Sequence, residues 1–303
     1  MEALLIPWVL LLVVILDAVC LIKRWWKAGV VIAIVLLLVN WHWNVFSVGF
    51  NSLDKHKNPN YLRVMTWNIS CADTTVAMDV DGLVAAIQRE NPDMIFITEY
   101  GRHLFPVVDS LLCNSFPYRG GIENWRSWSD FYSHVPIDSC YMVETERNGC
   151  VLRYNVRFSD SRLRLYCTHL QSTNLLNNES FYPDSIQDGG SAVRYLKNYQ
   201  LASDIRGEQA NMTVDDFDDA PIIVLGDMND VAGSHALSIF MESGLRDAWW
   251  VGGLGYGATI HEPLPYRIDH ILYSSGLQLK GVKKVNAKGL SDHDALVADF
   301  EIK

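Results

Sequence analysis

The sequence predicts an α/β domain that follows a hydrophobic helical hairpin. Two apolar runs, residues 3–22 and 29–50, open the chain. Behind them, residues 61–98 have the pattern strand, helix, strand, and the apolar run at 222–225 has the length of a strand buried on both faces. Strands that alternate with helices are typical of α/β folds. We therefore expect a transmembrane hairpin at 1–50, a polar linker at 51–60 and one soluble domain at 61–303.

The two apolar runs have the length of membrane-spanning helices, which need about 20 residues. Only Pro7 and Asp17 interrupt the first run, and the second is long enough if its polar residues lie near the lipid headgroups. The alternative, a signal peptide followed by a core helix, is disfavoured because the charged residues follow the first run and no small-residue cleavage site is present. The flanking tryptophans suit the interfacial belts of a membrane: Trp25, Trp26, Trp41 and Trp43.

The charge of the hairpin loop predicts the orientation in the membrane. Lys23, Arg24 and Lys27 lie between the two runs, and a basic loop of this kind stays cytoplasmic. Both chain ends are then extracytoplasmic, so the soluble domain is predicted in the periplasm or outside the cell. Basic residues after the second run favour the opposite orientation of the chain in the membrane.

Charge and cysteine content narrow the function of the soluble domain. The chain has 25 basic and 35 acidic residues, of which three basic and two acidic lie in residues 1–50, so the remainder has a net charge of −11. Proteins that bind long nucleic acids usually have a basic excess, which makes this function less expected. The cysteines lack the CxxC spacing of a zinc site, and a Cys140–Cys150 disulfide is not expected from the predicted hairpin register.

The order of elements in the soluble domain follows from periodicity and from turn residues. Apolar residues at helical spacing predict helices, alternating or continuous apolar runs predict strands, and Asn148-Gly149 predicts a hairpin turn. Residues 174–190 and 252–257 are expected as loops. The predicted order is strand 61–69, helix 80–88, strand 94–98, helix 102–112, strand 131–137, hairpin 141–144 with 150–158, strand 162–169, helix 191–210, strand 222–225, helix 235–241, strand 267–273 and strand 295–302.

Polar residues recur at the ends of these strands and in matching loops. Each alone has an ordinary explanation, such as a helix cap, a turn or a surface charge. As a set, their carboxylate and amide oxygens suit a hard divalent cation such as Mg²⁺, and their imidazoles suit proton transfer and phosphate binding near neutral pH. The set comprises Asn68, Glu99, His169, Asp227, Asn229, Asp269, Asp292 and His293.

Six short stretches occur in the order found in one known family: residues 64–69, 97–99, 168–170, 226–229, 267–270 and 291–293. On these motifs, residues 61–303 resemble the endonuclease/exonuclease/phosphatase superfamily, which has the deoxyribonuclease-I-like fold. Thr98 departs from the pattern, since glutamine commonly precedes this glutamate. The resemblance implies two packed mixed β-sheets flanked by helices, a four-layer α/β sandwich, and a metal-dependent hydrolase acting on phosphate ester bonds.

The resemblance also implies a role for each residue of the set. Glu99 would be the principal ligand of Mg²⁺, or of Mn²⁺ in its place, supported by Asn68 and Asp292. His293 would be the general base, oriented by Asp269. The remaining three would act on water and on phosphate: Asp227 would orient or deprotonate the attacking water, whereas His169 and Asn229 would bind the phosphoryl oxygens.

The substrate is left open by the sequence. The expected activity is that of a membrane-anchored phosphoesterase cleaving a lipid headgroup, a small phosphodiester or nucleic acid, and a nuclease is the alternative within the class. A non-catalytic binding module and a membrane scaffold are the alternatives outside it. Further phosphate-binding and base-stacking candidates are Arg119, Arg126, Arg267, Trp125, Trp128 and Tyr256. The sequence predicts no oligomeric state.

Overall fold

The computed structural model describes residues 2–50, 53, 57–69, 79–99, 105–120, 129–144, 150–159, 161–173, 191–261 and 264–303. Its centre is a pair of mixed six-stranded sheets. The first sheet has the order β13 (Leu277–Val285), β14 (Ala295–Ile302), β2 (Leu62–Asn68), β3 (Met94–Thr98), β5 (Asp130–Ser133) and β4 (Tyr118–Gly120). The second has the order β10 (Arg246–Asp247), β12 (Asp269–Tyr273), β9 (Ile222–Asp227), β8 (Ser161–His169), β7 (Cys150–Phe158) and β6 (Ile137–Glu144).

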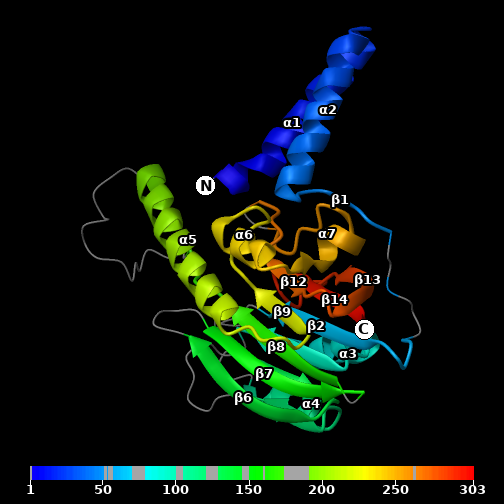
Figure 1. Cartoon of the computed structure of the whole chain (residues 1–303), viewed down its shortest axis with the longest axis vertical. Coiled ribbons are helices and arrows are strands. Elements are labelled where there is room, and N and C mark those ends of the chain that lie inside the picture. Colours follow the sequence, from blue (N-terminus) through cyan, green and yellow to red (C-terminus); the bar gives the residue numbers. More distant parts are fainter. Residues whose placement is uncertain are drawn as a thin grey trace.

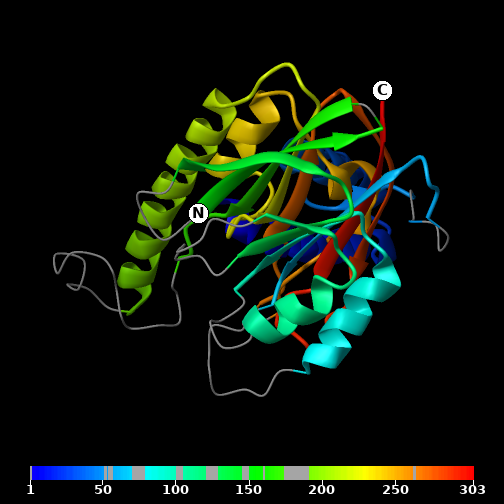
Figure 2. The same cartoon turned by 90° about the horizontal axis from the view of Figure 1, so that it is seen from below.

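Alternation along the strands builds three apolar layers. In β2, Val64 points into the core between the sheets, whereas Met65 and Trp67 point to the outer side, and all three are fully buried. Helices α3 (Val80–Glu90) and α4 (Phe105–Leu112) cover that outer face. Helices α5 (Ser191–Asp215) and α6 (His235–Glu242) cover the outer face of the second sheet. Figure 2 shows these helices on opposite sides of the strands, which confirms the predicted four-layer sandwich.

The N-terminal apolar runs form a pair of helices, as predicted. Helix α1 (Glu2–Ile22) and helix α2 (Trp26–Trp43) pack against each other and project from the domain beside α6 and α7 (Ala248–Gly252) (Figure 1). Both are long and apolar enough to cross a membrane. Directly after α2, the short strand β1 (Ser47–Val48) pairs with β11 (Leu254–Gly255) of the domain.

Several element boundaries differ from the sequence expectation. The strand predicted at 131–137 is two strands, since Pro136 separates β5 of the first sheet from β6 of the second. Strand β12 begins two residues later than predicted, at Asp269. The expected glycine-rich loop at 252–257 contains β11, and β13 was not predicted, because its outward lysines and Gly281 obscure the apolar alternation of an edge strand. The turn at 148–149 and the expected loop at 174–190 lie outside the described residues.

Candidate active site

The candidate site lies where four strand ends from the two sheets meet. Asn68 is the last residue of β2 and Glu99 follows β3, while His169 and Asp227 end β8 and β9. β2 runs parallel to β3, and β8 parallel to β9, with His169 directly beside Asp227. The carboxyl ends within each pair therefore lie at the same edge. A hydrogen bond of 2.9 Å from Asn68 Nδ2 to Asp227 Oδ2 joins the two sheets at that edge.

Strand alternation directs these side chains between the sheets. Along β8, Leu163, Leu165 and Cys167 pack in the inter-sheet core, and His169 is the next residue of the same face. Asn68, Asp227 and Asp269 continue the inward-facing sets of β2, β9 and β12 in the same way. The site is thus the polar end of the core between the sheets. Polar side chains there are held by the strands and remain close to the surface.

Two antiparallel strands, β12 of the second sheet and β14 of the first, bring Asp269 and His293 into the site. Asp269 is the first residue of β12 and lies opposite Asp227 in the ladder. His293 precedes β14, and Trp67 Nε1 donates a hydrogen bond of 2.9 Å to its carbonyl oxygen. Ser291 Oγ accepts from the backbone N–H of His293 at 3.0 Å. These bonds fix the turn that carries the imidazole, and His293 Nδ1 donates to Asp269 Oδ2 at 2.8 Å.

The backbone around the site adopts left-handed conformations at residues other than glycine. Glu99 has φ 59° and Asn229 has φ 50°. Such conformations cost about 1–3 kcal/mol and concentrate at functional sites. Gly226 has φ 140°, and a Cβ there would lie 1.9 Å from the carbonyl oxygen of Thr168. Only glycine fits at this position, and it lets β9 approach β8 just before Asp227.

The carboxylate of Glu99 lies between a donor from each sheet, Asn68 of β2 and His169 of β8. Asn68 Nδ2 donates to its Oε1 at 2.9 Å, and His169 Nε2 lies 3.3 Å from the same oxygen. The histidine contact is electrostatic, since it lacks the alignment of a hydrogen bond. Burial opposes ionisation of Glu99, but the positive charge of His169 and the Asn68 amide outweigh it and lower its pKa to about 2. Glu99 is therefore ionised at every physiological pH.

Asp227 has the opposite electrostatic balance. Its side chain is buried, Oδ1 accepts the backbone N–H of Asn229 at 2.7 Å, and Oδ2 lies 3.9 Å from His169 Nε2. Burial and the neighbouring charge of Asp269 raise the pKa of Asp227 above the usual range of an aspartate. This carboxylate is consequently a stronger proton acceptor than an exposed aspartate.

The third carboxylate, Asp269, holds a histidine in its charged form. Burial disfavours the imidazolium of His293, but the Asp269 charge and hydrogen bond prevail and raise the pKa of His293 to about 10. His169 is also held above the ordinary pKa of histidine, against burial, by the charge of Glu99. The carboxylates of the site thus favour the protonated form of both imidazoles, that of His293 most strongly.

Comparisons with known proteins agree with this geometry. The sequence profile of the Endonuclease/Exonuclease/phosphatase family matches residues 65–293. The chain belongs to this family. Membership makes it an enzyme of the hydrolase class that acts on phosphate ester bonds. None of the curated proteins matches the chain in sequence.

Solved structures of the same fold cover about four fifths of the chain. D. rerio TDP2, complexed with a single-stranded DNA product, is 17% identical with a TM-score of 0.58 and covers 79% of this chain and 98% of its own. The Beutenbergia cavernae endonuclease/exonuclease/phosphatase is 17% identical, with a TM-score of 0.57 and coverage of 80% and 72%. The human Nocturnin catalytic domain, with a bound sulfate anion, is 17% identical, with a TM-score of 0.52 and coverage of 80% and 94%. At these identities the likeness establishes the fold.

The ligand atoms at the strand ends of the candidate site suit a divalent cation. Ligand atoms of Glu99, His169 and Asp227 lie within 4.8 Å of one another, and so do those of Asp227, Asp269 and His293. Asp269 Oδ1 and both ring nitrogens of His169 are buried without a hydrogen-bond partner among the described residues. Buried polar atoms without partners are costly, and a bound cation with its water would supply partners. The oxygen-rich set suits Mg²⁺ or Mn²⁺ better than a thiolate-seeking metal.

Two of the eight predicted site residues lie at the margin of the cluster. The side chain of Asp292 is 52% exposed, and its Oδ1 lies 4.0 Å from His293 Nε2, so it does not join the two ligand groups. Asn229 donates its side-chain N–H to the carbonyl oxygen of Leu170 at 3.0 Å. Its amide braces the turn after β9, while its backbone N–H holds Asp227. The structure brings the other six together: Asn68, Glu99, His169, Asp227, Asp269 and His293.

Of the additional phosphate-binding and stacking candidates, the three that the structure describes, Arg267, Arg119 and Tyr256, do not join the site. Arg267 is fully buried and donates to Asp247 Oδ2 at 2.6 Å, so it serves the interior of the second sheet. Arg119 forms salt bridges with Asp130 and Asp109. The ring of Tyr256 packs against Phe46, which makes it a packing residue. Arg126, Trp125 and Trp128 lie outside the described residues.

Ser291 is a positioning residue that sequence reasoning left without a role. Its hydroxyl donates to the carbonyl oxygen of Asn68 at 2.7 Å and accepts from the backbone of His293. It therefore ties the end of β2 to the turn that carries His293. The signal was present in the sequence, because Ser291 opens the Ser-Asp-His motif at 291–293.

Proposed function

We propose that the chain is a membrane-anchored, Mg²⁺-dependent phosphoesterase that hydrolyses a phosphodiester or phosphomonoester by attack of water. Residues 61–303 are the catalytic domain, and residues 1–50 are the transmembrane anchor. One observation supports the metal dependence above all others. Three carboxylates, the half-buried Glu99 and the buried Asp227 and Asp269, meet at one edge, and within the described chain none of them forms a salt bridge with lysine or arginine.

The cation would be held by Glu99, with Asn68 and Asp227 beside it. When bound, Mg²⁺ supplies Lewis-acid stabilisation of the negative charge that builds on the phosphoryl oxygens. The hydrogen bond between Asn68 Nδ2 and Glu99 Oε1 orients the carboxylate toward that position. Asp292 lies too far out to share this role directly in the described structure.

The proton transfers are assigned from the electrostatics of Asp227 and His293. Since His293 is held as an imidazolium by Asp269, it is better suited to donate a proton than to accept one. Asp227, whose pKa is raised, is the better base for the attacking water. In this scheme water adds to phosphorus as Asp227 takes its proton, the ester P–O bond breaks, and His293 Nε2–H protonates the leaving oxygen. His169 stabilises the phosphoryl oxygens.

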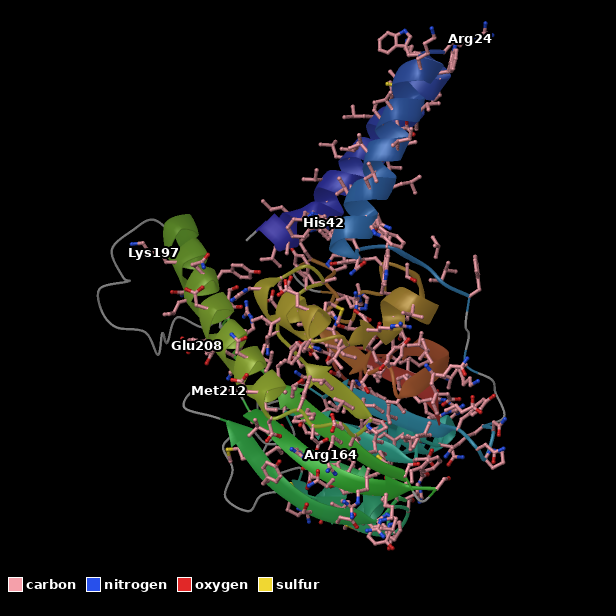
Figure 3. The ribbon with its side chains drawn as sticks, viewed as in Figure 1. Arg24, His42, Arg164, Lys197, Glu208 and Met212 are labelled. Carbon is pink, nitrogen blue, oxygen red and sulfur yellow. The ribbon has the colours of Figure 1, made fainter. Side chains whose placement is uncertain are left out.

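The exposure of the helices supports the membrane anchor. A core helix would bury most of its apolar residues, but only 17% of the apolar window of α1 and 6% of that of α2 are buried. Helix α2 would be about 27 Å long at 1.5 Å per residue, close to the thickness of the hydrocarbon core. Figure 3 shows Arg24 at the far tip of the hairpin and His42 at the end next to the domain. The basic tip would stay cytoplasmic and the catalytic domain extracytoplasmic.

A nuclease is the second candidate function. The structure of D. rerio TDP2 with a single-stranded DNA product has the same fold, and this supports a polynucleotide as a second candidate substrate. The acidic balance of the soluble domain weighs against a long polyanion.

A substrate panel tests the proposal. The full chain in detergent micelles is assayed with bis-p-nitrophenyl phosphate, supercoiled plasmid and phospholipid vesicles, each in Mg²⁺ and in EDTA. We expect hydrolysis in Mg²⁺ that EDTA abolishes and that Glu99→Ala lacks. Asp138→Asn, on the exposed face of β6, is the matched control and should retain full activity. Full activity of Glu99→Ala, or of the wild type in EDTA, would refute the proposal.

A further inference from the structure

The hairpin is joined to the domain by a packed junction. Asn40 near the end of α2 exchanges two hydrogen bonds with the backbone of Phe46, at 2.7 and 2.9 Å. Ser47 is buried, and its hydroxyl donates to the carbonyl oxygen of Gly253 at 2.6 Å. A Cβ on Gly49 would lie 2.6 Å from the backbone of Gly252. The chain between α2 and residue 50 is therefore held against α7 and β11, and the orientation of the domain relative to the hairpin is fixed.

The hairpin also contacts the loops that carry the catalytic cluster. Trp8 Nε1 donates to Tyr266 Oη at 3.4 Å, and the two rings meet edge to face with centroids 6.4 Å apart. The backbone of Ile260 bridges both Tyr266 and His293. Two strand spacings, about 10 Å, thus separate the backbone beside Trp8 from that of His293. The candidate site and the base of the hairpin lie at the same end of the domain.

A second contact reaches the loop that follows β9, whose last residue is Asp227 of the candidate site. Trp43 of α2 packs so closely on Gly233 that a Cβ there would lie 2.5 Å from its ring. Gly233 follows Asp227 and Asn229 by a few residues. Both catalytic loops of the second sheet, the one after β9 and the one before β12, therefore touch the hairpin.

Exposed apolar side chains surround this junction. Of the nine large apolar side chains that are exposed in the described chain after α2, five lie in the segments that adjoin the hairpin. Val48 and Leu254 are direct partners in the β1–β11 ladder and are 76% and 64% exposed, and Phe50 beyond them is 83% exposed. We name the group the apolar rim: Val48, Phe50, Val251, Leu254 and Leu264.

The apolar rim is continuous with two helices whose apolar faces are also uncovered. Contiguous exposed apolar surface marks a contact with protein or membrane. Here the chemistry of the neighbouring surface favours a membrane, because both helices are long and apolar enough to cross one and leave most of their apolar residues uncovered. Trp8, Trp41 and Trp43 lie at the same level, and tryptophan favours the headgroup region. A bilayer that accommodates the hairpin would also meet the rim.

We infer that the apolar rim inserts into the outer part of the bilayer and seats the catalytic edge at the headgroup level, so that the substrate is a phosphate ester borne by a membrane lipid. This inference rests on the proposed phosphoesterase function and on the proposed anchor. The hairpin sets the orientation, and the rim sets the distance between the lipid headgroups and Glu99, Asp227 and His293.

The test uses the full chain reconstituted in vesicles of phosphatidylcholine and phosphatidylglycerol. Lipid hydrolysis, followed as release of the water-soluble headgroup product, is compared with hydrolysis of soluble bis-p-nitrophenyl phosphate by the same vesicles. A triple variant, Val48→Ser with Phe50→Ser and Leu254→Ser, replaces the three most exposed residues of the apolar rim and should leave the fold intact. Val107→Ser is the matched control, since Val107 is an exposed apolar residue of α4, a helix on the outer face of the first sheet.

We expect the rim variant to lose about tenfold in lipid hydrolysis while it cleaves the soluble diester at the wild-type rate, and the Val107→Ser protein to keep both activities. The three substitutions replace apolar side chains that would lie in the bilayer by polar ones, and the transfer free energy that is lost corresponds to at least this change. Cleavage of the soluble diester with no lipid hydrolysis, or an unchanged ratio in the rim variant, overturns the inference and leaves the phosphoesterase proposal standing. A wild type that hydrolyses neither the lipid nor the soluble diester overturns both this inference and the phosphoesterase proposal.

Discussion

Two buried clusters of aspartates lie side by side in the second sheet, and their charges are balanced differently. Asp269 and His270 are consecutive in β12 and point to opposite faces, the first into the candidate site and the second into a structural network. In that network, Asp247 accepts from Arg267 at 2.6 Å, and His270 bonds the carbonyl oxygen of Asp230 at 3.0 Å.

The structural network supplies a guanidinium for each of its carboxylates. Arg206 Nε donates to Asp230 Oδ2 at 2.9 Å, and both side chains are completely buried. Although burial opposes ionisation of Asp247, the charge of Arg267 keeps its pKa well below the usual range. Three carboxylates in the candidate site share two imidazoles instead, and the pKa of Asp227 rises. The contrast separates charge that stabilises the fold from charge that is left for a cation and a substrate.

The largest expected effect is loss of activity when the site loses His293. His293→Ala should reduce kcat/KM by about 10²–10⁴-fold, the usual contribution of a positioned acid or base. Its thermal unfolding in Mg²⁺ should stay cooperative, because the substitution removes no part of the apolar cores. Steady-state kinetics on bis-p-nitrophenyl phosphate, with circular dichroism as the folding control, measure this. A variant with wild-type kcat/KM would contradict the assignment of His293 to the chemistry.

The next effect is a loss of stability in the structural network. Arg206→Ala should lower the free energy of unfolding by about 3–5 kcal/mol, because it leaves the buried Asp230 without its only charged partner among the described residues. Urea unfolding in EDTA measures the change, and Arg157→Ala, which removes an exposed ion pair, serves as the matched control with a cost below about 1 kcal/mol. An Arg206→Ala protein that unfolds at the same urea concentration as the wild type would contradict the stabilising role of the structural network.

A smaller effect concerns pH. The pKa of His293 is raised to about 10 from its ordinary value of 6.5, so the imidazolium–Asp269 pair stabilises the folded state fully below about pH 6.5. This contribution is lost as pH rises through about 10. In EDTA, the difference in unfolding free energy between wild type and His293→Gln should therefore shrink from pH 6.5 to pH 10.5. A difference that grows over this interval would reverse the sign of the pair's contribution.

The residues at the strand ends were easier to predict from the sequence than the side chains around them, because strand patterns are local and tertiary contacts are not. His169 and Asp227 each follow a strand pattern that is visible within a few residues, and parallel pairing then brings the strand ends together. Asp292 was predicted as a ligand, but the Ser291 hydrogen bonds orient the turn so that His293 points inward and Asp292 outward. The direction of one side chain in a tight turn depends on such tertiary bonds.

Contacts between residues that are far apart in the sequence account for the remaining differences between the predicted and the observed structure. Arg267 was a phosphate-binding candidate from the sequence, yet its partner Asp247 lies 20 residues away on β10, and only the folded sheet shows the pairing. The five-residue helix α7 depends on the same aspartate, which caps it by accepting from Trp249 N at 2.8 Å. The contact of Trp8 with Tyr266 spans 258 residues. None of these contacts leaves a periodic signal in the sequence.

We propose that the three carboxylates of the site, which form no salt bridge with lysine or arginine in the described chain, hold a divalent cation. Isothermal titration calorimetry of the full chain with MgCl₂ tests it directly, with Glu99→Gln as the site variant and Asp138→Asn as the control. We predict one saturable Mg²⁺ site in the wild type and in Asp138→Asn, and at least about tenfold weaker binding in Glu99→Gln. The charge balance described here would be contradicted by a wild type that binds no Mg²⁺, or by a Glu99→Gln protein that binds it with wild-type affinity.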